Sequence, residues 1–241
     1  MASIVTGRRA RPKQGRLAPA ALAFRRHLLA WYARHRRRLP WRGVRDPYAV
    51  LVSEVMLQQT QVARAIEFYP RFLARYPTLE DLAAAPADAV RESWDGLGYY
   101  ARARNLHAAA RQVMKRLGGR LPRRAEDLAA LPGIGRYTAG AVASLAFGAD
   151  VPAVDTNAAR VLARAFRIRG RPKSARRERR VWALAAALVP RGRAADWNQA
   201  LMDLGARYCV ARAPRCPACP VRRSCAVGTP TTPGKPGQEE R

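Results

Sequence analysis

Apolar residues recur every three or four positions along most of the chain, which is the spacing of one face of an α-helix. In residues 17–35, for example, Phe24, Leu28, Trp31 and Tyr32 follow this spacing. Proline and glycine separate the helical segments. Helices are predicted near residues 17–35, 47–59, 63–75, 79–84, 87–94, 101–117, 126–130, 136–148, 157–166, 175–188 and 194–207. No alternating strand pattern of useful length is present. The sequence therefore predicts an all-α fold of two packed helical lobes with a cleft between them.

The two ends of the chain differ from the rest. Residues 1–16 carry five Arg or Lys side chains with no apolar segment behind them, so we expect a disordered basic arm rather than a signal peptide. Pro, Gly and Thr dominate residues 226–241, which predicts a disordered tail. Because no run of about eighteen uncharged apolar residues occurs, we expect no membrane span and a cytoplasmic protein.

The charge of the chain favours a polyanionic partner. The formal net charge is +28, from 45 basic and 17 acidic residues. A nucleic acid is the partner that such a balance indicates. The alternative is a solvated basic surface, because an Arg-rich and Ala-rich composition also arises from coding bias alone.

All four cysteines lie near the end of the chain, at Cys209, Cys216, Cys219 and Cys225. A disulfide framework would spread cysteines through a small secreted domain. Their clustering in a chain without a secretion signal instead indicates a metal site in a reducing compartment. The spacing by itself is compatible with zinc and with an iron–sulfur cluster.

A glycine-rich turn precedes the helix predicted at residues 136–148. Pro132, Gly133 and Gly135 break the helical pattern, and glycine lets a ligand approach the backbone closely. The unpaired N–H groups at the following helix start suit an anion such as a nucleic-acid phosphate. The alternative is a helical hairpin whose glycines only form the turn.

Two acidic residues stand out. Glu54 lies in a helix that is apolar nearly all round, where a carboxyl is rarely buried without a partner. It either faces solvent beside Gln58 or is a buried acid whose raised pKa lets it donate a proton near neutral pH. Asp155 precedes a predicted helix start, so it is a candidate N-cap whose charge the helix N–H groups preserve. One neutral acid and one fixed carboxylate are the pair that glycosidic cleavage requires.

Residues 53–62, 96–106 and 197–205 resemble the adenine DNA glycosylases of the MutY family, within the endonuclease III superfamily. The segment 131–155 is similar to the superfamily's helix-hairpin-helix and the aspartate that follows it. The resemblance covers about residues 22–225. It implies one lobe at residues 46–150, which holds Glu54 and the hairpin. A second lobe joins residues 17–45 to residues 151–225 and holds an iron–sulfur loop.

The family removes adenine mispaired with guanine or 8-oxoguanine from double-stranded DNA. By this resemblance, Glu54 protonates adenine at N7, and Asp155 stabilises the oxocarbenium character of the deoxyribose. Tyr137 stands where strand-cutting relatives place a lysine. A phenol cannot form the Schiff base that lyase chemistry needs. The resemblance therefore implies a monofunctional glycosylase.

The resemblance also assigns roles to smaller groups of residues. The cysteine spacing matches the superfamily's loop for a [4Fe–4S] cluster with a structural role. Gln59 and Tyr99 match residues that wedge into the base stack. The hairpin glycines, Gly133 and Gly135, match the phosphate grip, and Arg212 and Arg215 are expected at the DNA backbone. The residues expected to line the adenine pocket are Arg37, Trp41, Arg42, Leu57, Val62 and Gln199.

Some features depart from the family pattern or leave rivals. Thr156 stands where many members have glycine. The sequence continues for sixteen residues after Cys225, so we expect it not to include the members' C-terminal domain that helps recognise 8-oxoguanine. We expect a monomer that corresponds to the catalytic domain. A thymine glycosylase acting on G·T mismatches is the nearest alternative, although the polar residues 58–61 favour adenine. The other alternative is a non-catalytic damage-binding module. Glu54 and Asp155 make it less favoured, because a binding module has no need of a buried acid.

Overall fold

A computed structural model of the protein describes residues 17–228, and every regular element in that range is helical. The predicted all-α class is therefore confirmed. One short 3₁₀ turn, Arg222–Ser224, follows the last helix. The α-helices are α1 (Pro19–His35), α2 (Pro47–Met56), α3 (Val62–Arg75), α4 (Leu79–Ala84), α5 (Ala87–Glu92), α6 (Ala101–Leu117), α7 (Ala125–Leu128), α8 (Arg136–Leu145), α9 (Thr156–Ala165), α10 (Ala175–Leu188) and α11 (Ala194–Arg207).

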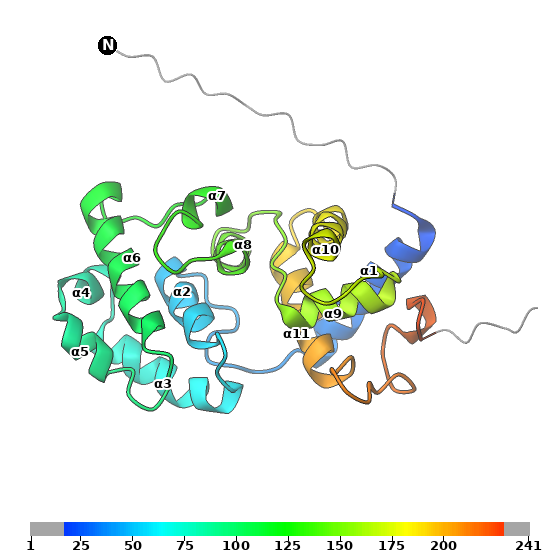
Figure 1. Cartoon of the computed structure of the whole chain (residues 1–241), viewed down its shortest axis with the longest axis horizontal. Helices are drawn as coiled ribbons and strands as arrows, with labels where there is room; N and C mark the ends of the chain where they lie inside the picture. Colours follow the sequence, from blue (N-terminus) through cyan, green and yellow to red (C-terminus); the bar gives the residue numbers. More distant parts are fainter. Residues whose placement is uncertain (1–16, 229–241) are drawn as a thin grey trace, which may run out of the picture.

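The helices form two groups with separate apolar cores (Figure 1). Helices α2 to α8 surround the first core, and α1 packs with α9, α10 and α11 around the second. The first and last parts of the described chain thus meet in one lobe. Trp41 belongs to the first core, where its ring meets Tyr69 edge-on at a centroid distance of 5.5 Å. The apolar boundary between the lobes therefore falls a few residues before the predicted position 46.

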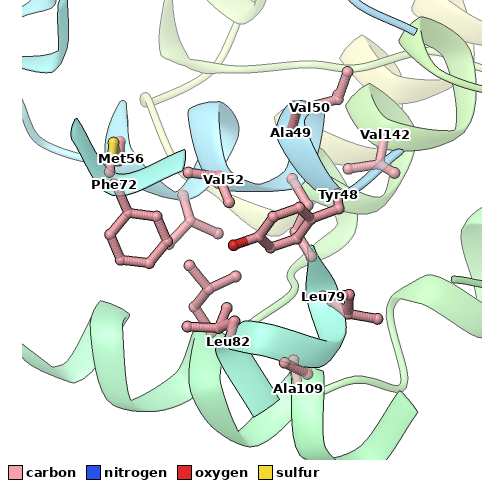
Figure 2. Packing of buried hydrophobic residues seen from close by; sticks show 14 of the residues in the cluster. Tyr48, Ala49, Val50, Val52, Met56, Phe72, Leu79, Leu82, Ala109 and Val142 are labelled. Atoms are coloured by element: carbon pink, nitrogen blue, oxygen red, sulfur yellow. The ribbon is translucent and has the colours of Figure 1, made fainter. Parts of the chain in front are cut away.

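Helix α2 lies at the centre of the first lobe because nearly all its side chains are apolar and buried. Figure 2 shows Tyr48, Val52 and Met56 of α2 among Phe72, Leu79 and Leu82 from the helices that surround it. The Tyr48 hydroxyl within this cluster is satisfied, because it donates to the Tyr76 carbonyl oxygen at 2.8 Å. Burial on this scale fixes the helix, and with it the position of Glu54 in its last turn.

The connection from α8 to α9 is fixed by a buried amide. Asn198 of α11 is 1% exposed, and its Nδ2 donates to Ser144 Oγ at 2.9 Å and to the Val151 carbonyl oxygen at 3.0 Å. Its Oδ1 accepts from the Ala153 N–H at 3.0 Å. A Cβ on Gly140 would lie 2.3 Å from the Pro152 carbonyl oxygen, so only glycine fits there. These contacts set where Asp155 lies relative to α8.

The structure differs most from the predicted boundaries at the ends of two helices and at the start of the tail. Helix α8 ends at Leu145 instead of residue 148. Helix α2 ends at Met56 instead of residue 59, because the chain turns and Gln59 adopts a left-handed φ of 57°. Residues 226–228 form a turn in which the Ala226 N–H donates to the Ala165 carbonyl oxygen at 3.0 Å, so order extends past the predicted start of the tail. The predicted arm at 1–16 and the rest of the tail, 229–241, lie outside the described residues. None of the helices in the described range is long and apolar enough to cross a membrane.

Candidate active site

A cavity of about 590 Å³ lies where the two lobes meet. The first lobe contributes the end of α2 and the start of α8, and the second contributes the start of α9 and one face of α11. All three predicted catalytic residues line it, as do all six predicted pocket residues and Gln59: Glu54, Tyr137, Asp155, Arg37, Trp41, Arg42, Leu57, Val62, Gln199 and Gln59. The structure therefore brings together residues that are more than 160 positions apart in the sequence.

Glu54 is a buried acid at the floor of this cavity. Glu54 is only 5% exposed, so the alternative in which its side chain faces solvent is wrong. The Tyr137 hydroxyl donates to Glu54 Oε2 at 2.6 Å. Burial raises the pKa of Glu54 to about 7, against the opposing effects of the Tyr137 hydrogen bond and the Arg42 charge. Near neutral pH the carboxyl is therefore divided between its acid and its anion, as a general acid requires.

Asp155 is the N-cap of α9, as predicted. Its Oδ1 accepts from the Ala158 N–H at 2.7 Å, and its Oδ2 accepts from Asn157 Nδ2 at 2.8 Å. These bonds and the nearby Arg160 charge favour the carboxylate, but burial outweighs them and raises the pKa of Asp155 above its usual value. The predicted effect of the helix N–H groups is present, and burial opposes it. The cap lowers the pKa, and desolvation has the larger effect.

A hydrogen-bonded network supports the opposite wall. Arg42 donates to the Tyr32 hydroxyl at 2.7 Å, and that hydroxyl donates to Gln199 Oε1 at 2.7 Å. Arg42 and Arg37 both pair with Asp203, whose side chain is fully buried, at 2.8 and 2.7 Å. Asp203 thus holds Arg37 and Arg42 in position, and Tyr32 holds Gln199.

Several of these residues were not predicted. Tyr32 and Asp203 sit at core-facing positions of helices, where nothing in the local pattern separates a network member from a packing residue. Met202 contacts the Tyr137 hydroxyl through its sulfur at 3.8 Å, and Gln58 Nε2 donates to Thr138 Oγ1 at 3.2 Å. Only Asp203 offered a signal, since a carboxyl on an apolar helix face needs a cationic partner.

The two predicted wedge residues both have unusual backbones. Gln59 has φ 57° and Tyr99 has φ 51°, a left-handed region that non-glycine residues seldom adopt. Tyr99 is 59% exposed, so it is not a core aromatic residue. Both side chains are displayed on turns instead of being packed within helices.

The hairpin glycines have different local roles. Gly133 has φ 70°, and a Cβ there would lie 2.5 Å from Asn105 Cβ, so close packing alone requires glycine. Gly135 is the exposed N-cap of α8, makes no side-chain cap bond and has open space around its Cβ position. The first N–H groups of α8 therefore have no capping side chain, which leaves them available to an anion.

The four cysteines are free thiols that line one cavity of about 110 Å³ in the second lobe. Burial, with smaller effects of the other three thiols, raises the pKa of Cys219 to about 11. No group of three or more ligating side chains within residues 17–228 is arranged to hold a single metal ion. Arg160 and Arg164 of α9 donate to the Cys209 carbonyl oxygen at 2.7 and 3.4 Å, which attaches this loop to the helix that Asp155 caps. Arg212 and Arg215 of the loop are exposed.

Comparison with known proteins agrees with this arrangement. Residues 52–186 match the family described as HhH-GPD superfamily base excision DNA repair protein. A protein of Mycobacterium tuberculosis named adenine DNA glycosylase is 44% identical over 218 residues, which cover 87% of this chain and 70% of that protein. The chain belongs to the adenine DNA glycosylase family of the HhH-GPD superfamily. The predicted family is therefore confirmed.

Other relatives extend the comparison of this family member. The adenine DNA glycosylase of Rattus norvegicus is 50% identical over 212 residues, covering 84% of this chain and 41% of the relative. The chain thus spans about two fifths of the length of that relative. A thermostable thymine-DNA glycosylase has a similar structure, with a TM-score of 0.78 and 33% identity over 87% of this chain and 96% of that one. A trapped complex of endonuclease III with DNA gives a TM-score of 0.74 at 25% identity, over 88% and 98% of the two chains.

Proposed function

We propose that this protein is a monofunctional DNA glycosylase that hydrolyses adenine mispaired with guanine or 8-oxoguanine in double-stranded DNA. The observation that carries the proposal is the pair of carboxyl groups in one cavity between the lobes. Glu54 has a pKa of about 7 and Asp155 lines the same cavity. The relatives' shared name supports adenine as the base.

In the proposed reaction, Glu54 is the general acid. A proton from its carboxyl goes to N7 of the flipped adenine, which turns the base into a neutral leaving group when the glycosidic bond breaks. A buried carboxyl with a pKa near the working pH is suited to this transfer. The Tyr137 hydroxyl holds Oε2, so the carboxyl has one fixed orientation toward the cavity.

Asp155 is proposed to act as an anion beside the sugar. As the bond breaks, positive charge develops on the deoxyribose, and a carboxylate in a site of low dielectric stabilises it strongly. The bonds from Ala158 and Asn157 hold the Asp155 carboxylate in place before the charge develops. Water then attacks the sugar to complete the hydrolysis, and the product is an abasic site.

The absence of an amine supports the monofunctional assignment. Tyr137 occupies the hairpin position, and no lysine lines the cavity in the part of the chain that the structure describes. Neither the phenol nor the carboxyl groups can form an imine with the abasic sugar. The DNA strand is therefore expected to stay unbroken after adenine is released.

The four cysteines are proposed to hold a [4Fe–4S] cluster. Four thiols that line one cavity fit such a cluster, whose iron atoms are held by cysteine thiolates. When bound, the cluster would crosslink the loop 209–225. The exposed Arg212 and Arg215 would then be presented to the DNA backbone as part of a fixed loop.

The deciding experiment is a single-turnover assay on three duplexes that differ at one pair: A·G, A·8-oxoguanine and T·G. Release of adenine, with strand breaks only after hot alkali, is expected. Borohydride should trap little protein on the DNA, whereas Tyr137→Lys should gain some trapping and nicking. Release of thymine alone would favour the rival activity that the thymine-DNA glycosylase structure suggests. Alkali-independent nicking by the unmutated protein would contradict the monofunctional assignment.

A further inference from the structure

Arg102, near the start of α6, connects the two turns that carry Gln59 and Tyr99. Its Nη1 donates to the Met56 carbonyl oxygen at 2.8 Å and to Thr60 Oγ1 at 2.9 Å, and it also bonds the Gln58 carbonyl oxygen. Its Nη2 faces the other turn and donates to the carbonyl oxygens of Leu97 at 3.1 Å and Gly98 at 2.9 Å. One guanidinium therefore bonds the backbone before Gln59, the Thr60 hydroxyl after it, and the backbone just before Tyr99.

Both turns need an external support. Gln59 and Tyr99 hold left-handed backbones at φ 57° and 51°, and such strain persists only where the surroundings determine the conformation. The carbonyl groups that Arg102 holds include those of Gln58 and Gly98, the residues immediately before these two. Its guanidinium also lies over the Tyr99 ring, 5.6 Å from the centroid. Arg102 thus contacts the backbone immediately before Gln59 and Tyr99, and it also contacts the Tyr99 side chain.

The charge of Arg102 is not available to DNA. The residue is 8% exposed, and within residues 17–228 no carboxylate pairs with it. Carbonyl dipoles and the rings of Trp94 and Tyr99 are its partners. An arginine that bound a phosphate would need an exposed guanidinium, so the role of Arg102 is internal.

We infer that Arg102 is a positioning residue that sets the spacing of the Gln59 and Tyr99 turns, so that both side chains enter the base stack as one unit. This inference rests on the proposed function, in which an adenine leaves the stack. Lysine cannot replace arginine here, because a single ammonium cannot direct parallel donors to two separate turns. The arginine fork spans both turns without moving.

The test uses a duplex with 2-aminopurine opposite guanine, since this adenine analogue fluoresces more strongly when it is unstacked. Arg102→Met and Arg102→Lys are compared with Arg111→Met, which removes the same charge from an exposed position on the same helix. Binding to undamaged duplex is measured by anisotropy at several salt concentrations. Because Arg102 is buried, both Arg102 variants should keep the wild-type salt slope.

The fluorescence rise on saturating binding should fall at least about tenfold in both Arg102 variants, because each disrupts several charge-assisted hydrogen bonds and one such bond is worth about a tenfold change in an equilibrium. It should stay unchanged in Arg111→Met. Thr60→Val removes a single acceptor from Nη1, so a smaller loss of the fluorescence rise is expected. Its melting temperature should be close to that of the wild type. If Arg102→Met has a much lower melting temperature, Thr60→Val still tests the inference in a folded protein.

A wild-type fluorescence rise in Arg102→Met, or in Thr60→Val together with Arg102→Lys, would overturn the inference. So would a weaker salt slope in the Arg102 variants, because it would make Arg102 a phosphate ligand. Failure of the proposed function has a different signature. In that case the unmutated protein itself would give no fluorescence rise and release no adenine.

Discussion

The Tyr137 hydroxyl donates a 2.6 Å hydrogen bond to Glu54 Oε2, across the interface between α8 and α2. Tyr137 is the second residue of α8, and Gly135 is the N-cap of that helix. The N-cap that is expected to face a phosphate and the residue that holds the buried acid are therefore two positions apart at the start of one helix. Because Tyr137 donates to the acid, it favours the carboxylate and opposes the effect of burial on the pKa of Glu54.

Removing the proton of Glu54 should abolish most of the catalysis. Glu54→Gln keeps the shape and the acceptor for Tyr137, so we expect a loss of about 10²–10⁴-fold in single-turnover adenine release, with mismatch binding retained. Glu92→Gln, at an exposed position of α5, is the matched control and should react at the wild-type rate. Near-normal release by the Glu54 variant would show that another group donates the proton.

The same substitution should change how stability depends on pH. The pKa of Glu54 rises from 4.5 to about 7 on folding, so the native state binds a proton that the unfolded chain releases. This contribution to stability is present below about pH 4.5 and is lost as the pH rises through about 7. The free energy of unfolding of each protein is expressed relative to its own value at pH 4. On this scale, Glu54→Gln should exceed the wild type at pH 8 by on the order of 3 kcal/mol. Parallel urea melts at both pH values check this, and identical pH profiles would contradict it.

Tyr137→Phe should move the alkaline limb of the rate profile. The Tyr137 hydrogen bond lowers the pKa of Glu54, so its loss raises that pKa further above its ordinary value. The fall in single-turnover rate with rising pH should therefore shift to higher pH in the variant. Tyr76→Phe is the control, because the Tyr76 hydroxyl has no hydrogen-bond partner among the described residues. A shift to lower pH would mean that Tyr137 acts through some other contact.

An aspartate at the N-cap of α8 should separate helix stability from DNA binding. Gly135→Asp introduces a preferred N-cap residue into open space, so the melting temperature should hold or rise. Its carboxylate would compete with a phosphate for the same N–H groups, and binding to every duplex should weaken alike. Gly135→Asn caps without charge and is the control. Equal DNA affinities of the two variants would show that the N-terminus of α8 does not contact DNA. Gly133 is unsuitable for the test, because any Cβ there meets Asn105.

The cysteine loop should bind iron. Protein purified without oxygen is expected to contain about four irons per chain and to absorb broadly in the visible range. Cys216→Ser should lose the iron and weaken DNA binding together, if the loop presents Arg212 and Arg215 to the backbone. Stoichiometric zinc without iron would contradict the cluster. Loss of iron with unchanged DNA affinity would remove the loop from the interface.

The sequence by itself determined the helices and the candidate chemistry. Apolar periodicity and the proline and glycine breaks located α1 to α11 closely, because helix formation depends on neighbours three and four residues away. Their local context singled out Glu54 and Asp155, and the family resemblance singled out Tyr137. The N-cap role of Asp155 was likewise predictable, because capping involves only the next three residues.

Only the tertiary structure decided how these groups behave. Whether Glu54 faced solvent or the interior depended on α8, whose Tyr137 is 83 residues away. The raised pKa of Asp155 follows from burial between two lobes, which no local pattern records. Tyr32, Asp203 and Arg102 were not predicted because their partners come from other helices and turns. Desolvation and long-range hydrogen bonds depend on what packs against a residue, and that is fixed only when the chain has folded.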